Sequence, residues 1–310
     1  MHVPTIVCPV DYSDCSKRAL RFAGALADHF HARLLVLHVF DPRLGATAGL
    51  HGFDLTGSDG QRELDYFTAD HLPETVREGT QLERLLALGS PGREIIRAVR
   101  ARDADLLVMG THGFSGARRA VFGSTLQGVL RRVKVPVLAV PLVDHREAGI
   151  HAPLVASGPV LAPVDFSPES EAAAHAAAGL ARALELPLLL LHATAPDGET
   201  TGDGTARTED AAAKMARLCQ KLGTIAPLES RIVEGEPSAL IAKLARERRS
   251  ALVVMSLGSA AMRRRRRKPG SIAYRVLSLA PVPVLALPET PSGRLYIQYI
   301  GHGAAVATTA

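Results

Sequence analysis

The chain contains no tryptophan, and aromatic residues make up only 4% of it. Alanine, leucine and valine dominate instead, which suits layered packing of helices on a sheet better than an aromatic-rich binding sandwich. A length of 310 residues is typical of about two domains, and 47% hydrophobic with 22% charged residues is ordinary for a soluble globular protein. The composition therefore predicts an α/β protein.

Cysteine is also scarce. Cys8, Cys15 and Cys219 are odd in number and form no Cys-x-x-Cys pair, which indicates a reducing compartment. No apolar run approaches the roughly 20 residues of a membrane span, and the amino terminus lacks the basic and long apolar segments of a signal peptide. We therefore expect a cytoplasmic protein that does not contact a membrane.

Several motifs of ATP-using enzymes are missing. The chain has no GxxxxGK[ST] loop, no SGGxDS loop and no HIGH or KMSKS signature. No acid or nucleophile is spaced to work with His112, so we predict no catalytic residue and no metal-ligating residue. Weak hydrolysis of a bound nucleotide is left open, because a phosphate with a metal can turn over without a dedicated base.

The chain is an internal repeat. The pattern of Thr5–Ser13 (TIVCPVDYS) recurs at Pro159–Ser167 (PVLAPVDFS), and Val135–Ala139 (VPVLA) recurs at Val282–Ala286. Each half alternates short apolar runs with helical patterns, and the strands of the first half are expected at 4–10, 33–39, 81–88, 105–109 and 136–140. This alternation predicts two tandem doubly wound, Rossmann-like domains.

Each predicted domain is a five-stranded parallel sheet in the order 3-2-1-4-5, with helices on both faces. We place the first domain at 1–146, a linker at 147–157, the second domain at 158–289 and a tail at 290–310. His38 and His192 end corresponding strands, which favours structural roles for both.

A glycine pattern follows the fourth predicted strand. Gly110, Gly113, Gly123 and Ser124 lie in VMGTHGFSGARRAVFGS, directly after the apolar run that ends at Met109. Glycine lets a ligand approach the backbone, and a helix that begins at Ser124 would direct N–H groups at an anion. In the predicted strand order Asp11 and Gly110 follow neighbouring strands, so both would face one crevice. The alternatives are a tightly packed glycine-rich loop and a turn-capping role for Asp11.

From Val3 to Pro288 the chain resembles two fused universal stress protein domains. Gly110-Thr111-His112-Gly113, nine residues and then Gly123-Ser124 are similar to the ATP-binding motif of the nucleotide-binding branch of that family. The resemblance implies a stress-response or regulatory protein that binds ATP, with Mg²⁺ left open, chiefly in the first domain. Residues implied to surround the nucleotide are Pro9, Val10, Asp11, Val39, Met109, Gly110, Thr111, His112, Gly113, Gly123, Ser124 and Thr125.

Within that set, the resemblance implies that the glycines, Ser124 and Thr125 surround ribose and phosphates. Pro9, Val10 and Asp11 would border the adenosine, with Asp11 at a ribose hydroxyl, and Val39 would form a wall for adenine. The family's last strand often pairs with a counterpart, so the strands at 136–140 and 283–287 are implied to join the halves into an intramolecular pseudo-dimer. Further association into a homodimer is left open.

The second half departs from the motif. Ser256-Leu257-Gly258 replaces Gly-Thr-His-Gly, and eleven residues rather than nine precede Gly270-Ser271. The added residues include the basic run Arg263–Lys268, for which we rank a solvated loop above a phosphate clamp, and both above a nucleic-acid or acidic-membrane patch. With a net charge of +5, a charge-driven interaction or nucleic-acid scaffold without nucleotide is the alternative function. Nucleic acid is disfavoured because no aromatic residue interleaves the basic run.

Overall fold

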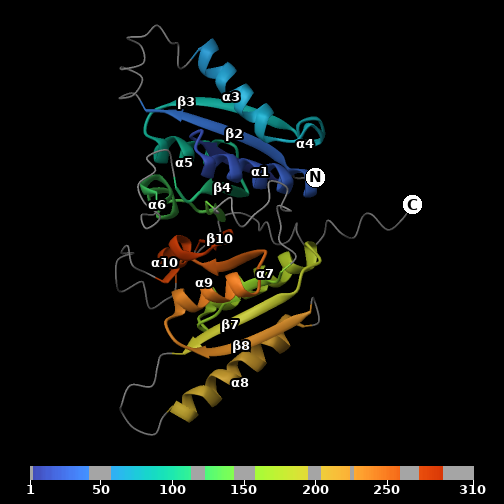
Figure 1. Ribbon diagram of the computed structural model, residues 1–310, viewed down its shortest axis with the longest axis vertical. Coiled ribbons are helices and arrows are strands. Elements are labelled where there is room, and N and C mark those ends of the chain that lie inside the picture. The colour runs from blue at the N-terminus through green and yellow to red at the C-terminus, as the bar shows by residue number, and fades with distance from the viewer. Residues whose placement is uncertain are drawn as a thin grey trace, which may run out of the picture. The chain divides into compact units, whose positions relative to one another are not determined.

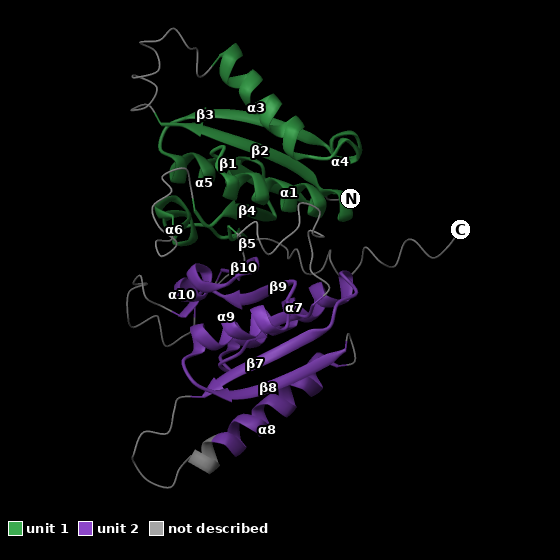
Figure 2. Ribbon diagram, viewed as in Figure 1, with its two compact units in different colours: residues 1–144 green, residues 145–310 purple. Residues whose placement is uncertain are grey.

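The computed structural model describes residues 3–41, 57–112, 123–142, 158–194, 204–223, 227–258 and 272–288. The chain divides into two compact units, unit 1 at Met1–Asp144 and unit 2 at His145–Ala310 (Figure 2). Gly113, the basic run Arg263–Lys268, the predicted linker and the predicted tail lie outside the described residues.

Unit 1 holds five strands and five helices within its described residues (Figure 1). The strands are β1 (Thr5–Val10), β2 (Arg33–Phe40), β3 (Leu82–Leu88), β4 (Leu106–Gly110) and β5 (Val137–Val140). The helices are α1 (Asp14–His29), α3 (Ser58–His71), α4 (Glu74–Gly79), α5 (Pro91–Ala101) and α6 (Ser124–Leu130).

The sheet of unit 1 is parallel throughout and has the order β3-β2-β1-β4-β5. Helix α1 packs against α3 and α4, whereas α5 packs against α6, and the two groups cover the two faces of the sheet. Ile6, Val7 and Cys8 of the central strand are completely buried, as expected when helices cover both faces. The predicted order 3-2-1-4-5 is confirmed.

Unit 2 repeats this topology with the order β8-β7-β6-β9-β10, again parallel throughout. Its strands are β6 (Val160–Pro163), β7 (Leu188–Thr194), β8 (Leu228–Glu234), β9 (Leu252–Ser256) and β10 (Val284–Leu287). Its helices are α7 (Pro168–Ala183), α8 (Gly204–Leu222), α9 (Pro237–Glu247) and α10 (Ile272–Leu279). Helix α7 packs against α8, and α9 packs against α10.

The segment between β2 and β3 differs from a simple strand–helix alternation. Two helices, α3 and α4, fill it, because Pro73 separates them and cannot donate a backbone hydrogen bond that would continue α3. The first helix begins at Asp14, since Ser13 caps it.

The outer strands β3 and β8 carry the same ion pair. Arg102 donates to both carboxylate oxygens of Glu83, at 3.2 and 2.5 Å, and Arg248 donates to both of Glu229, at 2.8 and 2.5 Å. The hydrogen bonds from Arg248 and then Arg231 lower the pKa of Glu229 to about 2, and Arg102 likewise lowers the pKa of Glu83. Charged side chains on an edge strand oppose pairing with another chain.

Candidate functional site

The turn from β1 into α1 is built by the Pro-Val-Asp-aromatic-Ser motif. Oδ1 of Asp11 accepts hydrogen bonds from the backbone N of Ser13 at 3.2 Å and from its Oγ at 2.5 Å. Tyr12, between them, has a φ of 64°, a left-handed conformation that Asp11 helps to hold. Oγ of Ser13 then accepts from the backbone N of Ser16 at 3.2 Å and caps α1. These contacts give Asp11 a role in forming the turn, and Ser13 is the cap of the helix.

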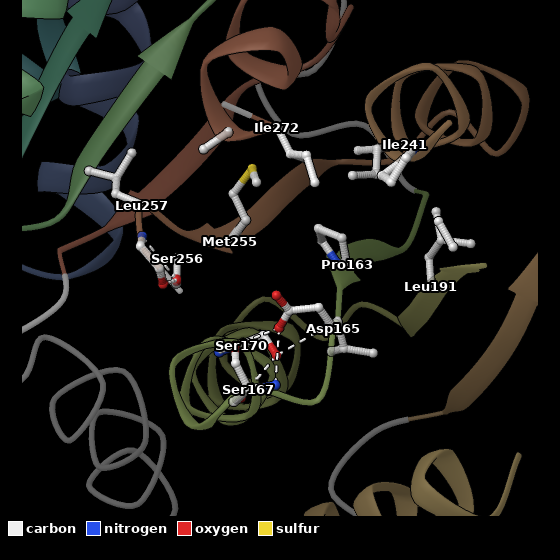
Figure 3. A pocket seen from close by; sticks show the side chains of 15 residues that line it. Pro163, Asp165, Ser167, Ser170, Leu191, Ile241, Met255, Ser256, Leu257 and Ile272 are labelled. Atoms are coloured by element: carbon white, nitrogen blue, oxygen red, sulfur yellow. Dashed lines mark hydrogen bonds between the residues drawn. The ribbon is translucent and has the colours of Figure 1, made fainter. Parts of the chain in front are cut away.

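Unit 2 builds the same turn from Asp165, Phe166 and Ser167 (Figure 3). Oδ1 of Asp165 accepts from the backbone N and Oγ of Ser167 at 3.0 and 2.5 Å, and Phe166 has a φ of 60°. Burial alone would raise the pKa of Asp165, but hydrogen bonds from Ser167 and Ser170 outweigh it and hold the pKa below its ordinary value. Asp165 is therefore a carboxylate at neutral pH. The repeated aspartate is explained by turn formation in both units.

The two histidines near the carboxyl ends of β2 and β7 are structural, although each strand continues two residues further, to Phe40 and Thr194. Nδ1 of His38 lies 2.8 Å from the carbonyl oxygen of Val10, and Nδ1 of His192 lies 2.8 Å from that of Val164. Each ring packs on the aromatic residue of the neighbouring turn, with centroids 4.4 Å apart for both Tyr12–His38 and Phe166–His192. Burial lowers the pKa of His38, so its ring is neutral at neutral pH. The predicted structural roles agree with this geometry.

Gly110, at the end of β4, is in contact with the first turn of α1. A Cβ added at Gly110 would stand 3.0 Å from Sγ of Cys15 and 3.1 Å from its carbonyl carbon. Sγ of Cys15 in turn donates to the carbonyl oxygen of Val140 at 3.2 Å. The missing Cβ therefore makes room for α1, and this packing explains the glycine without a ligand. A contact between Gly110 and a nucleotide stays a prediction.

Thr111, His112 and Gly123 lie together although ten residues separate the last two. The backbone N of Gly123 donates to the carbonyl oxygen of Thr111 at 3.0 Å, and a Cβ on Gly123 would stand 3.1 Å from that oxygen. Oγ1 of Thr111 lies 2.9 Å from Nδ1 of His112. The two ends of the predicted motif are thus adjacent.

The remaining predicted residues occupy the carboxyl ends of neighbouring strands. Pro9 and Val10 end β1, Met109 precedes Gly110 on β4, and Val39 follows His38 on β2. Val10 and Met109 are buried, whereas Pro9 and Val39 are partly exposed. Ser124, exposed, and Thr125, partly exposed, begin α6. Parallel strands end on one edge of a sheet, so these residues share that edge.

A cavity of about 130 Å³ lies at the corresponding edge of unit 2 (Figure 3). Several lining residues occupy the repeat positions of predicted site residues of unit 1. Pro163, Val164 and Asp165 correspond to Pro9, Val10 and Asp11, Ala193 to Val39, Met255 to Met109, and Ser256 to Gly110. The cavity thus opens beyond the carboxyl ends of β6 and β9, where ligands of doubly wound sheets bind.

The lining is mostly apolar, with carboxylate and hydroxyl groups at one side. A cavity of this size accommodates roughly one aromatic ring, since an engineered apolar cavity of about 150 Å³ binds benzene. Oγ of Ser256 donates to the carbonyl oxygen of Gly258 at 2.5 Å. The full lining is Pro163, Val164, Asp165, Ser167, Ser170, Leu191, Ala193, Pro237, Ile241, Met255, Ser256, Leu257, Gly258, Ile272 and Ala273.

Some lining residues were not predicted. Pro237 and Ile241 come from α9, and Leu191 comes from β7 (Figure 3). Their signal in the sequence is the apolar face of the helix that follows the third strand, whose unit 1 counterparts are Pro91 and Ile95. An apolar helix face of this kind is also typical of the hydrophobic core. The sequence alone therefore does not show which of its residues line a cavity and which only pack in the core.

No group of three or more His, Cys, Asp or Glu side chains in the described ranges is placed to hold a metal ion. None of the helices in those ranges is long and apolar enough to cross a membrane.

The fold defines the class of protein: a tandem pair of doubly wound α/β domains, with a cavity at the carboxyl ends of the strands of unit 2. The model of the universal stress protein family matches residues 2–141 and 157–288. The chain belongs to the universal stress protein family, which confirms the resemblance, and each unit holds one match.

The relatives compared by sequence each match less than half of this chain. A universal stress protein of Methanocaldococcus jannaschii is 32% identical over 141 residues, which are 44% of this chain and 80% of that protein. One from Thermus aquaticus is 33% identical over 137 residues, 44% of this chain and 97% of the relative. A solved structure of a universal stress protein from Archaeoglobus fulgidus is 21% identical to this chain, with a TM-score of 0.61. The match covers 93% of this chain and 99% of that protein's chain. This last likeness concerns the fold.

Proposed function

We propose that this chain is a cytoplasmic stress-response protein that binds ATP chiefly in unit 1 and acts by binding rather than by turnover. The observation that carries the proposal is the cavity of unit 2, because its lining repeats the residues expected at the adenosine in unit 1. Only unit 1 combines that edge with the complete glycine motif.

The residues of unit 1 fit a nucleotide in two respects. Gly123 donates its backbone N–H to the carbonyl oxygen of Thr111, so the two ends of the glycine motif meet at one place. The N-cap of α6 is Gly123, which has no side chain to occupy the first-turn N–H groups. First-turn N–H groups without a side-chain cap are suited to phosphate oxygens.

The proposed roles follow the positions of the residues. Pro9, Val10 and Val39 would contact the adenosine, Asp11 would accept a hydrogen bond from a ribose hydroxyl, and Met109 would line the base. Phosphates would lie at the residues of the glycine motif, from Gly110 onward in the sequence. The proposed phosphate and ribose contacts are Gly110, Thr111, His112, Gly113, Gly123, Ser124 and Thr125.

In unit 2 the same edge differs where phosphates would bind. Ser256 replaces the strand-end glycine and turns its hydroxyl toward Gly258. The cavity retains space for a ring, so we propose that unit 2 binds ATP more weakly than unit 1. The number of binding sites found in a titration with ATP shows whether one unit or both units bind the nucleotide.

Calorimetric titration with ATP and Mg²⁺ tests the proposal in the full chain. Gly113→Asp places a carboxylate among the proposed phosphate contacts and should abolish the tighter site. Gly92→Asp is the matched control, because a Cβ at Gly92 would meet no atom within 4 Å and an acid in the first turn of α5 is tolerated. Equal loss of binding in both variants, or no binding by the unmodified chain, would contradict the proposal.

We also propose that β5 and β10 pair and make the chain an intramolecular pseudo-dimer. Each is the outermost strand of its own unit's order, and an unpaired edge invites association with other chains. Backbone N–H groups on the outer side of β5 should then exchange as slowly as those of β4 in hydrogen-exchange measurements. Fast exchange along that side would exclude the pairing.

A further inference from the structure

An open groove of about 750 Å³ lies on unit 1, between α5 and the residues that follow α6. Its basic lining residues are Arg93, Arg97 and Arg100 of α5, and Arg132 just after α6, and its apolar lining is Ile96 and Ala101. The three arginines of α5 recur at helical spacing and span roughly 10 Å along the helix axis. No acidic or aromatic residue is among the lining residues.

The arginines of this groove are largely without counter-charges. Among the described residues, Arg93, Arg100 and Arg132 make no ion pair and no hydrogen bond, and all three are exposed. Arg97 has one ionic contact, at 3.6 Å to Glu94, and its side chain is 81% exposed. Four neighbouring like charges repel one another, so the cluster gives no stability to the folded unit by itself.

Unit 2 shows that the fold does not require this cluster. The counterparts of Arg93 and Arg132 are Ala239 and Leu279, neither of which is charged. Lys243 takes the place of Arg97, and it forms an ion pair of 3.8 Å with Glu247, which replaces Ala101. The equivalent face of unit 2 is therefore less basic and partly neutralised, although both helices have the same length.

We propose that the groove of unit 1 binds a linear chain of phosphates, namely inorganic polyphosphate. The planar guanidinium group binds two phosphate oxygens at once, and a row of such groups suits an anion whose charge repeats along its length. Nucleic acid is less suited, because no aromatic side chain is present to stack a base. An acidic peptide would bring side chains for which Ile96 and Ala101 offer little apolar surface.

The test is a fluorescence-anisotropy titration of the full chain with end-labelled inorganic polyphosphate at several salt concentrations. The groove variant combines Arg93→Gln, Arg97→Gln and Arg100→Gln. The control variant combines Arg217→Gln, Lys243→Gln and Arg246→Gln, which removes the same charge from exposed positions of unit 2. Since all six positions are exposed, both variants should fold.

The groove variant should bind polyphosphate at least about tenfold more weakly, with a shallower salt dependence, and the control should change affinity by less than about twofold. ATP binding should be equal in both, because the groove lies outside the proposed nucleotide site. Equal losses in the two variants would overturn the proposal. So would binding of polyglutamate or double-stranded DNA as tight as that of polyphosphate, or loss of binding only when the run Arg263–Lys268 is neutralised.

Discussion

Tyr12 and Phe166 occupy the same position of the two turns and differ by one hydroxyl group. Oη of Tyr12 is buried and has no hydrogen-bond partner in the described part of the chain, and burial, with Glu63 as a second cause, raises the pKa of this phenol. The ring itself is well packed, on His38 at 4.4 Å and edge-on to Phe67 at 5.0 Å. A buried hydroxyl without a partner reduces stability.

Tyr12→Phe should therefore raise the free energy of unfolding by about 1 kcal/mol, because the ring contacts persist and the unsatisfied group is removed. Urea denaturation monitors the change. Tyr66→Phe is the control, since Tyr66 is 77% exposed and should show no effect. A destabilised Tyr12→Phe variant would mean that the hydroxyl has a partner outside the described residues.

Glu229 provides a prediction about pH. Its pKa in the folded chain is about 2, below the usual 4.5, because of Arg248 and then Arg231. The pair therefore stabilises the fold above pH about 4.5, and the contribution is lost as pH falls from there toward 2. Because the pair is partly exposed, water and salt screen its effect on stability, and the pKa itself is the better readout.

Arg248→Gln should return the pKa of Glu229 toward its usual value, as followed by NMR titration of the carboxyl carbon. Arg246→Gln, on the exposed side of the same helix, is the control and should leave that pKa unchanged. An unaltered pKa in Arg248→Gln would show that the bidentate contact does not form in solution.

The contact between α1 and β4 shows how one element constrains another. Gly110 lets the first turn of α1 approach β4, because Sγ and the carbonyl carbon of Cys15 fill the space of a Cβ. Gly110→Ala should lower the stability of unit 1 by about 1–3 kcal/mol through overpacking. Gly128→Ala in α6 has no atom within 4 Å of the added Cβ and should stabilise that helix by up to about 1 kcal/mol.

Urea denaturation of both glycine variants makes this comparison, with ATP binding measured alongside. If Gly110→Ala is as stable as the unmodified chain but loses ATP, the glycine serves the ligand and the packing explanation is wrong. Loss of stability with retained binding would support packing as its main role.

At the scale of helices and strands, the sequence predicts the type and the order of the elements well. The strands of unit 1 fall within a residue or so of their predicted bounds, because short apolar runs between turn residues have few other interpretations. The split into α3 and α4 depended on Pro73, which a count of alternating segments does not register. The direction of a missing Cβ, as at Gly110, depends on packing between elements and cannot be read from a motif.

For the whole molecule, the repeat predicts two domains, and the family match confirms two copies. The site is less predictable. The glycine motif draws attention to unit 1, whereas the cavity at the described residues lies in unit 2, formed by apolar side chains such as Ile241 and Leu191. The sequence does not show the arginine groove, because Arg132 is distant from Arg93 along the chain. The fold brings the two together by packing α5 against α6.

The most direct test of the central claim is a crystal structure of the full chain grown with ATP and Mg²⁺. The account predicts nucleotide density in unit 1 at the carboxyl ends of β1 and β4, with adenine beside Val39 and phosphates near Gly123 and Ser124. Density in unit 2 alone, or no nucleotide in a well-resolved structure at saturating ATP, would contradict it.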